Sequence, residues 1–111
     1  LNVTSYIEAL NEEEEYDESI AFLEGLETKE DTAILYLFAK TYEEMEEYEK
    51  AFENYQKAYE AGESSVEFLE DYIRFMIEEG RKDLAAPALQ EALKVDPFNP
   101  EFIRYTFIFE E

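Results

Sequence analysis

The sequence predicts an all-α protein, an α-α superhelix (solenoid) built from three helical hairpins and a C-terminal helix. Apolar residues recur at helical spacing along almost the whole chain. Only three Gly and three Pro interrupt these patterns. A set of apolar positions also occurs three times along the chain at a nearly constant interval. Short turns between many helices favour antiparallel neighbours that pack in pairs.

The helical pattern is clearest in residues 48–62, YEKAFENYQKAYEAG, whose apolar residues form one stripe with charged residues on the other side. Similar patterns occur along the rest of the chain. They predict helices near residues 3–13, 17–27, 32–45, 48–61, 65–79, 83–95 and 100–110. The stretch FIRYTFIF alternates like a strand, but Pro100 favours a helix because proline suits the first helical position.

Breakers and capping residues predict where the helices begin and end. Gly62 and Gly80 each follow a helical pattern, where a left-handed residue would end the helix. Ser64 and Glu67 have the spacing of a capping box at the start of the fifth helix. We expect Asp83 to cap the sixth helix, so that Pro87 falls in its first turn.

Six positions define the repeat. In the middle unit they are Leu35, Phe38, Tyr42, Ala51, Tyr55 and Ala58. Their counterparts in the next unit are Leu69, Tyr72, Met76, Ala85, Leu89 and Ala92, and those in the preceding unit are Val3, Tyr6, Leu10, Ser19, Leu23 and Leu26. The first interval is shorter than the second by two positions, and this difference falls in the ETKED connection. The repeats therefore cover about 1–31, 32–65 and 66–99 of a single domain, 1–111, with the C-terminal helix at 100–111.

This period and these residues resemble the tetratricopeptide repeat (TPR) family, whose pattern places a large residue, a small one and a tyrosine on the first helix, then A-x3-F and a second small residue on the next, and then P. The middle unit supplies Phe38, Ala39 and Tyr42, and the third unit closes on Pro97. The chain departs from the pattern at Ile7 and Ile73, which stand in the small slot and predict slightly wider helix pairs.

The resemblance implies binding of a partner peptide or helix in a concave groove lined by the first helix of each hairpin. The chain would be a non-catalytic protein–protein interaction scaffold or adaptor. The alternative is a regulatory or sensor segment of a larger multidomain protein. On the first helix the groove line would be Thr4, Glu8, Asn11 and Glu12. The candidate partner-binding residues farther along are Tyr36, Lys40, Glu44, Glu70, Arg74, Ile77 and Arg104.

Lys40 and Arg74 occupy the same slot one repeat apart, which predicts a separation of roughly 8–10 Å across packed helices. One interpretation is an anchor for a carboxylate of the bound peptide, with Tyr36 as a flat apolar contact. The other is that each cation is paired on its own helix, Lys40 with Glu44 and Arg74 with Glu70 or Glu78.

Composition limits the classes of function. The formal net charge of −21 disfavours nucleic acid and anionic membranes and favours a protein partner of basic or mixed charge. The chain has no Cys and no His, which removes the thiol nucleophile, the commonest general base and the commonest metal ligand. We expect no enzyme activity, cofactor or metal site, and a cytoplasmic location. The acidic run at 11–18 is expected to be a solvated turn.

The C-terminal stretch FIRYTFIFEE is apolar on more than one side of a helix. An end helix that faces solvent should be polar on its outer side. Two explanations stay open, that the chain continues and a following hairpin covers this surface, or that two copies form a homodimer through it.

Overall fold

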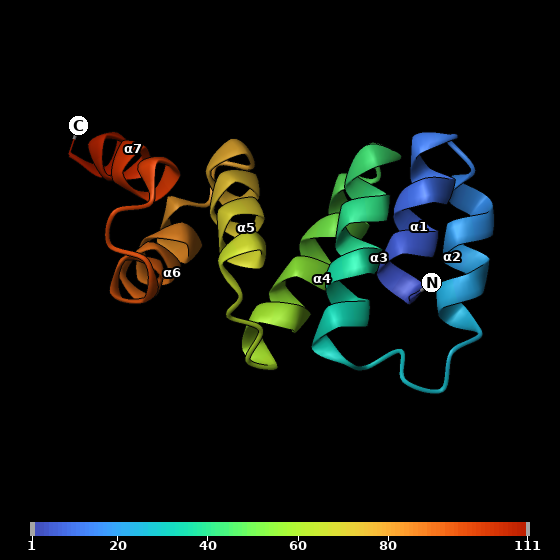
Figure 1. The fold of residues 1–111 in the computed structure, drawn as a ribbon. Helices are drawn as coiled ribbons and strands as arrows, with labels where there is room; N and C mark the ends of the chain where they lie inside the picture. The colour runs from blue at the N-terminus through green and yellow to red at the C-terminus, as the bar shows by residue number, and fades with distance from the viewer. Residues whose placement is uncertain (1, 111) are drawn as a thin grey trace. The chain divides into compact units, whose positions relative to one another are not determined.

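The computed structural model describes residues 2–110, so Leu1 and Glu111, at the ends of the predicted first repeat and last helix, lie outside the described residues. Within that range the chain folds into α-helices and contains no strand (Figure 1). The helices are α1 Val3–Glu12, α2 Tyr16–Glu24, α3 Thr32–Glu44, α4 Tyr48–Glu60, α5 Val66–Glu78, α6 Lys82–Val95 and α7 Pro100–Phe109. The predicted all-α repeat fold is confirmed.

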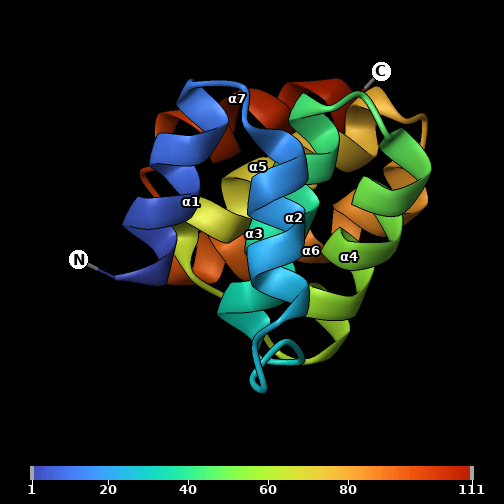
Figure 2. The ribbon, with the colours of Figure 1, turned by 90° about the vertical axis from the view of Figure 1, so that its right-hand side faces the viewer.

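The helices group into two compact units, residues 2–63 and 64–110. The first unit contains α1 to α4, that is, the first two predicted hairpins. There α1 packs on α2, α3 packs on α4, and α3 also contacts both α1 and α2 (Figure 2). In the second unit, α6 packs on both α5 and α7. That the repeats form a single domain stays a prediction.

The three turns inside the hairpins share one backbone geometry. Glu14, Glu46 and Gly80 have positive φ angles of 59°, 62° and 76°. In each turn the amide of the next residue donates to a carbonyl five residues back, as in Glu15 N to Leu10 O at 2.8 Å and Arg81 N to Met76 O at 2.7 Å. This is the Schellman ending of a helix. The turns recur at the same intervals as the side-chain repeat.

The predicted helix ends are confirmed in part. Gly62 has a positive φ of 103° after α4, as expected, and Pro100 is the first residue of α7. Asn99 caps α7 by accepting from the amides of Glu101 and Phe102 at 2.9 and 3.2 Å. The predicted cap at Ser64 is wrong by one residue, because Ser65 accepts from the amide of Phe68 at 3.3 Å.

The start of α6 was also predicted incorrectly. Arg81 is its N-cap residue, and Asp83 lies inside the first turn rather than before it. Pro87 therefore falls in the second turn, where a proline has no amide to donate to the carbonyl four residues earlier. An exposed pair explains the earlier start, since the Arg81 guanidinium donates to both carboxylate oxygens of Asp83 at 3.0 Å.

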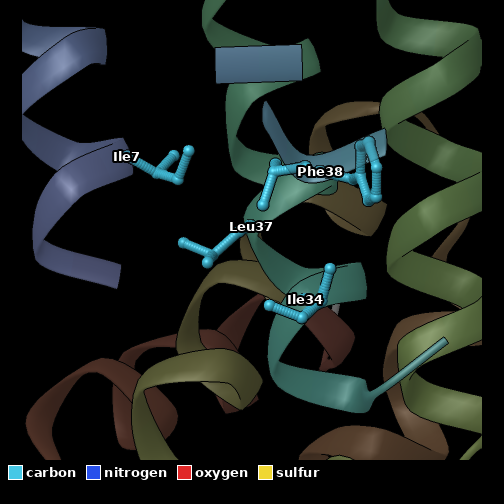
Figure 3. Packing of buried hydrophobic residues seen from close by; sticks show 5 residues of the cluster. Ile7, Ile34, Leu37 and Phe38 are labelled. Carbon is cyan, nitrogen blue, oxygen red and sulfur yellow. The ribbon is translucent and has the colours of Figure 1, made fainter. Parts of the chain in front are cut away.

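The core of the first unit gathers side chains from α1, α2 and α3. Its buried members are Ile7, Leu23, Ile34, Leu37 and Phe38. Ile7 on α1 and Leu37 on α3 point toward one another across the space between their helices (Figure 3). Partly buried residues, including Tyr6 and Leu26, pack around this cluster. The first hairpin is therefore attached to α3 through an apolar contact.

Candidate functional site

The first unit carries a surface hollow of about 410 Å³ between α1 and α3. Its lining consists of Glu8, Asn11, Glu12, Leu37, Lys40 and Glu44. The lining therefore combines three carboxylates, one ammonium group and one leucine side chain. The sequence placed Glu8, Asn11 and Glu12 on the groove side of the first helix and Lys40 and Glu44 on that of the third, and the structure brings these five residues to one hollow.

Lys40 is held between the two helices. Its Nζ lies 3.7 Å from a carboxylate oxygen of Glu8 on α1 and 5.1 Å from the ring centroid of Tyr36 on its own helix. The Lys40 side chain is 26 % exposed. Tyr36 is 9 % exposed and its ring lies 6.4 Å from that of Tyr55. Lys40 thus has an acidic partner within the hollow, and Tyr36 is largely covered.

Glu44 is a carboxylate of the hollow whose pKa is shifted by its surroundings. Partial burial raises its pKa above the ordinary value, and the neighbouring charge of Glu43 raises it further. Lys40 and a hydrogen bond from the Asn11 side chain act in the opposite direction without cancelling the effect of burial. A cation that entered the hollow would stabilise the ionised form of Glu44.

A buried polar network lies beneath the hollow. Asn11 Nδ2 on α1 donates to Thr41 Oγ1 on α3 at 2.9 Å, and Ser19 Oγ on α2 donates to Asn11 Oδ1 at 2.7 Å. Ser19 and Thr41 have no exposed surface, and Asn11 is 6 % exposed. This network links three helices and orients the amide that also bonds Glu44. Sequence reasoning missed it, although Asn11 and Ser19 stood out as polar residues in helical slots.

The other four candidate residues lie in the second unit. Arg74 on α5 is 2.9 Å from Glu78 and 3.7 Å from Asp71, both on the same helix. Glu70 accepts a hydrogen bond from Asn99 Nδ2 at 3.4 Å. Ile77 is half-buried. The expected pairing of Arg74 with Glu78 is present.

Arg104 on α7 is also paired. Its guanidinium lies 2.6 Å from Glu101 and 4.9 Å from the ring centroid of Tyr105. Each of the three candidate cations thus has a carboxylate neighbour. That the seven candidate residues form one groove across both units, with Lys40 close to Arg74, stays a prediction.

The described part of the chain shows neither a metal-binding cluster nor a membrane-spanning helix. Across residues 2–110, no group of three or more acidic side chains is arranged to hold a metal ion. None of the described helices is long and apolar enough to cross a membrane.

Comparison with known proteins identifies the repeats. Residues 33–99, more than half of the chain, match the family described as YpiA-like, C-terminal tetratricopeptide repeats. The chain is also similar to the TPR repeat-containing protein YpiA of Bacillus subtilis (strain 168), with 31 % identity over 105 residues. The match covers 86 % of this chain but 25 % of YpiA, so the chain spans about a quarter of its relative's length. The hairpins, their repeated turns and these matches agree, and the chain belongs to the tetratricopeptide repeat family.

Proposed function

We propose that this chain is a non-catalytic scaffold that binds a basic peptide or helix of a partner protein, with the α1–α3 hollow as its principal contact. Tetratricopeptide repeats generally mediate protein–protein interaction. The observation that carries the finer proposal is the charge of the hollow. Its lining offers the carboxylates of Glu8, Glu12 and Glu44 against the single ammonium of Lys40.

The charge balance favours a cationic partner over an acidic one. Lys40 is already close to Glu8, so a partner carboxylate would have to compete with that pair. A partner Lys or Arg would instead meet the carboxylates of Glu12 and Glu44 in charge-assisted contacts. The formal net charge of −21 adds long-range attraction for a basic segment. In a longer groove, the candidate residues Glu70, Arg74, Ile77 and Arg104 would contact the rest of the peptide.

The test is a binding titration with fluorescent peptide libraries that differ only in charge. We expect Lys/Arg-rich peptides to bind and Glu-rich peptides not to. For the best peptide, Glu12→Gln and Glu44→Gln should each weaken binding about 5- to 20-fold, the range expected for losing one charge-assisted contact. Glu53→Gln on the exposed side of α4 is the matched control for net charge and should have little effect.

The variant Lys40→Gln distinguishes two interpretations of the site, an acidic hollow that binds a cationic peptide and a cationic anchor that binds a carboxylate. If the hollow binds cations, removing the ammonium strengthens binding of the basic peptide. If Lys40 and Arg74 anchor a partner carboxylate, Lys40→Gln and Arg74→Gln instead weaken binding of an acidic peptide. Selective binding of Glu-rich peptides would contradict the proposal.

A second candidate function is suggested by the small share of YpiA that the chain covers. Because the chain matches 25 % of YpiA, the repeats could act as a regulatory or sensor segment of a longer protein rather than as a free adaptor. In that case the peptide bound at the hollow would change the activity of an attached domain. Measuring such an activity with and without the basic peptide, in wild type and Glu44→Gln, distinguishes this role from simple scaffolding.

A further inference from the structure

Two buried hydroxyl groups lie beneath the α1–α3 hollow. Ser19 on α2 and Thr41 on α3 have no exposed surface, so neither can touch a bound partner. A buried hydroxyl group needs a hydrogen-bond partner to offset the loss of water. Both hydroxyl groups have such a partner in the side-chain amide of Asn11, which does line the hollow. Ser19 and Thr41 are therefore connected to the hollow through Asn11.

The two hydroxyl groups bond opposite ends of the Asn11 amide. Ser19 Oγ donates to Asn11 Oδ1 at 2.7 Å, and Asn11 Nδ2 donates to Thr41 Oγ1 at 2.9 Å. Ser19 thus binds the carbonyl oxygen from α2, and Thr41 binds the nitrogen from α3. The amide nitrogen carries two hydrogens, so one N–H group remains after the bond to Thr41.

The remaining N–H group of Asn11 acts on Glu44. Glu44 follows Thr41 by about one helical turn on α3, and Asn11 and Glu44 line the same hollow. Partial burial raises the pKa of Glu44, and the hydrogen bond from the Asn11 side chain opposes that shift by stabilising the ionised form. The reversed amide would turn its carbonyl oxygen toward the carboxylate, so the orientation set by the two hydroxyl groups is the one that Glu44 needs.

We propose that Ser19 and Thr41 are positioning residues of the hollow, which orient the Asn11 amide so that it holds the Glu44 carboxylate in place for the cation of a basic peptide. This role rests on the proposed function and deepens it, because it names the buried groups that fix the contact with the partner. A carboxylate that is already oriented loses less conformational entropy when the peptide binds.

Other charged or titratable groups surround Glu44, and the variants below retain all of them. They come from α1, α2, α3 and the two hairpin turns, and they line the same hollows as Glu44 or follow it on its helix. They are Glu8, Glu12, Glu14, Tyr16, Asp17, Lys40, Glu43 and Glu46. Because none of them is changed, a difference between the variants reports the hydrogen-bond network.

The first measurement needs no partner. The titration of the Glu44 carboxyl group is followed by carbon-13 NMR in the whole chain. Thr41→Val keeps the shape of the side chain and removes the acceptor of the Asn11 amide. The midpoint of the Glu44 titration should then move to higher pH, because the ionised carboxylate loses a positioned donor. Thr41→Ser keeps the hydroxyl group and should restore the wild-type midpoint.

Two further variants complete this measurement. Ser19→Ala breaks the network from α2 and should move the midpoint of Glu44 in the same direction, so the test does not depend on one substitution. Ile34→Val is the matched control, since Ile34 is buried in the apolar core on α3 and takes no part in the network. It should leave the midpoint unchanged. Circular dichroism confirms that each variant is folded.

The second measurement uses the best Lys/Arg-rich peptide from the library titration. Thr41→Val and Ser19→Ala should each weaken its binding about 3- to 10-fold, as expected for the loss of one oriented hydrogen bond. In the Glu44→Gln background the same substitutions should have little further effect, because they act through Glu44. A merely structural role would weaken binding equally in both backgrounds.

The positioning role is overturned if Thr41→Val leaves the Glu44 midpoint at its wild-type value, or if Thr41→Ser shifts it as far as Thr41→Val does. Equal weakening of peptide binding with and without Glu44 overturns it as well. Failure of the proposed function gives a different result. In that case no basic peptide binds the wild-type chain, while the titration of Glu44 still responds to Thr41→Val.

Discussion

Glu14 and Glu46 hold the same left-handed backbone conformation, with φ of 59° and 62°, at equivalent turns of the first two hairpins. In the third hairpin the same position is Gly80, with φ of 76°. A residue with a Cβ is strained in this region, and glycine is not. The first two turns therefore adopt the same left-handed conformation as the third, although the residue at this position is glutamate rather than glycine.

Glycine should stabilise both turns. We expect Glu14→Gly and Glu46→Gly each to raise the free energy of unfolding by about 0.5–1 kcal/mol, because the strain at positive φ is removed. Gly80→Ala should lower it by about 1 kcal/mol for the same reason. Urea unfolding followed by circular dichroism measures all three. Glu13→Gly, one residue before the turn at φ −88°, is the control and should not stabilise.

The buried network beneath the hollow should be costly to break. Asn11→Ala leaves the hydroxyl groups of Ser19 and Thr41 buried without the amide, so we expect a loss of about 1–3 kcal/mol in unfolding free energy. Asn54→Ala is the matched control, since that amide bonds the Lys50 carbonyl of its own helix at an exposed position, at 2.9 Å. A double-mutant cycle with Thr41→Val should show coupling. Additive losses would mean that the two side chains act independently.

The pH dependence of stability should depend on Glu44. Because partial burial raises its pKa in the folded state, its ionised form opposes folding above that pKa, and protonation at lower pH removes the penalty. Glu44→Gln should therefore stabilise the chain at pH 7, and the difference from wild type should shrink as the pH falls through the carboxyl range. Glu60→Gln controls for the loss of one charge. A Glu44→Gln effect that grows on acidification would have the wrong sign.

Pro87 should cost α6 some stability. It stands in the second turn and cannot donate to the carbonyl of Asp83. We expect Pro87→Ala to raise the free energy of unfolding by about 1–2 kcal/mol, less than the full interior cost because proline also restricts the unfolded chain. Thermal unfolding measures the change. Gln90→Ala, at an exposed position of the same helix, should have a much smaller effect.

The sequence predicts the helices well because their ends are marked by residues with few other uses. Gly62 and Gly80 stand where positive φ occurs, and Pro100 begins α7. The cap at Ser65 rather than Ser64 could not be distinguished, since either hydroxyl is followed by a helical pattern. The start of α6 was missed because the pair of Arg81 with Asp83 places Asp83 inside the helix rather than at its cap.

The turns at Glu14 and Glu46 were missed because glutamate does not signal positive φ. The repeat could have revealed them, since Gly80 has its counterparts at these two positions. The site was predicted less completely. Spacing along one helix suggests Glu44 as a partner of Lys40, whereas the contact with Glu8 joins two helices. Such a contact depends on how the hairpins pack, which helical spacing alone does not determine.

The network of Asn11, Ser19 and Thr41 fixes the alignment of the first hairpin with α3. An apolar contact such as that of Ile7 with Leu37 tolerates sliding, because one methyl group can replace another. Hydrogen bonds of 2.7 and 2.9 Å do not tolerate sliding, because a shift by one helical turn would leave each donor and acceptor without its partner. The segment from Leu26 to Leu35 is two positions shorter than its counterpart from Ala58 to Leu69, and it can therefore differ in length while the helices keep their alignment.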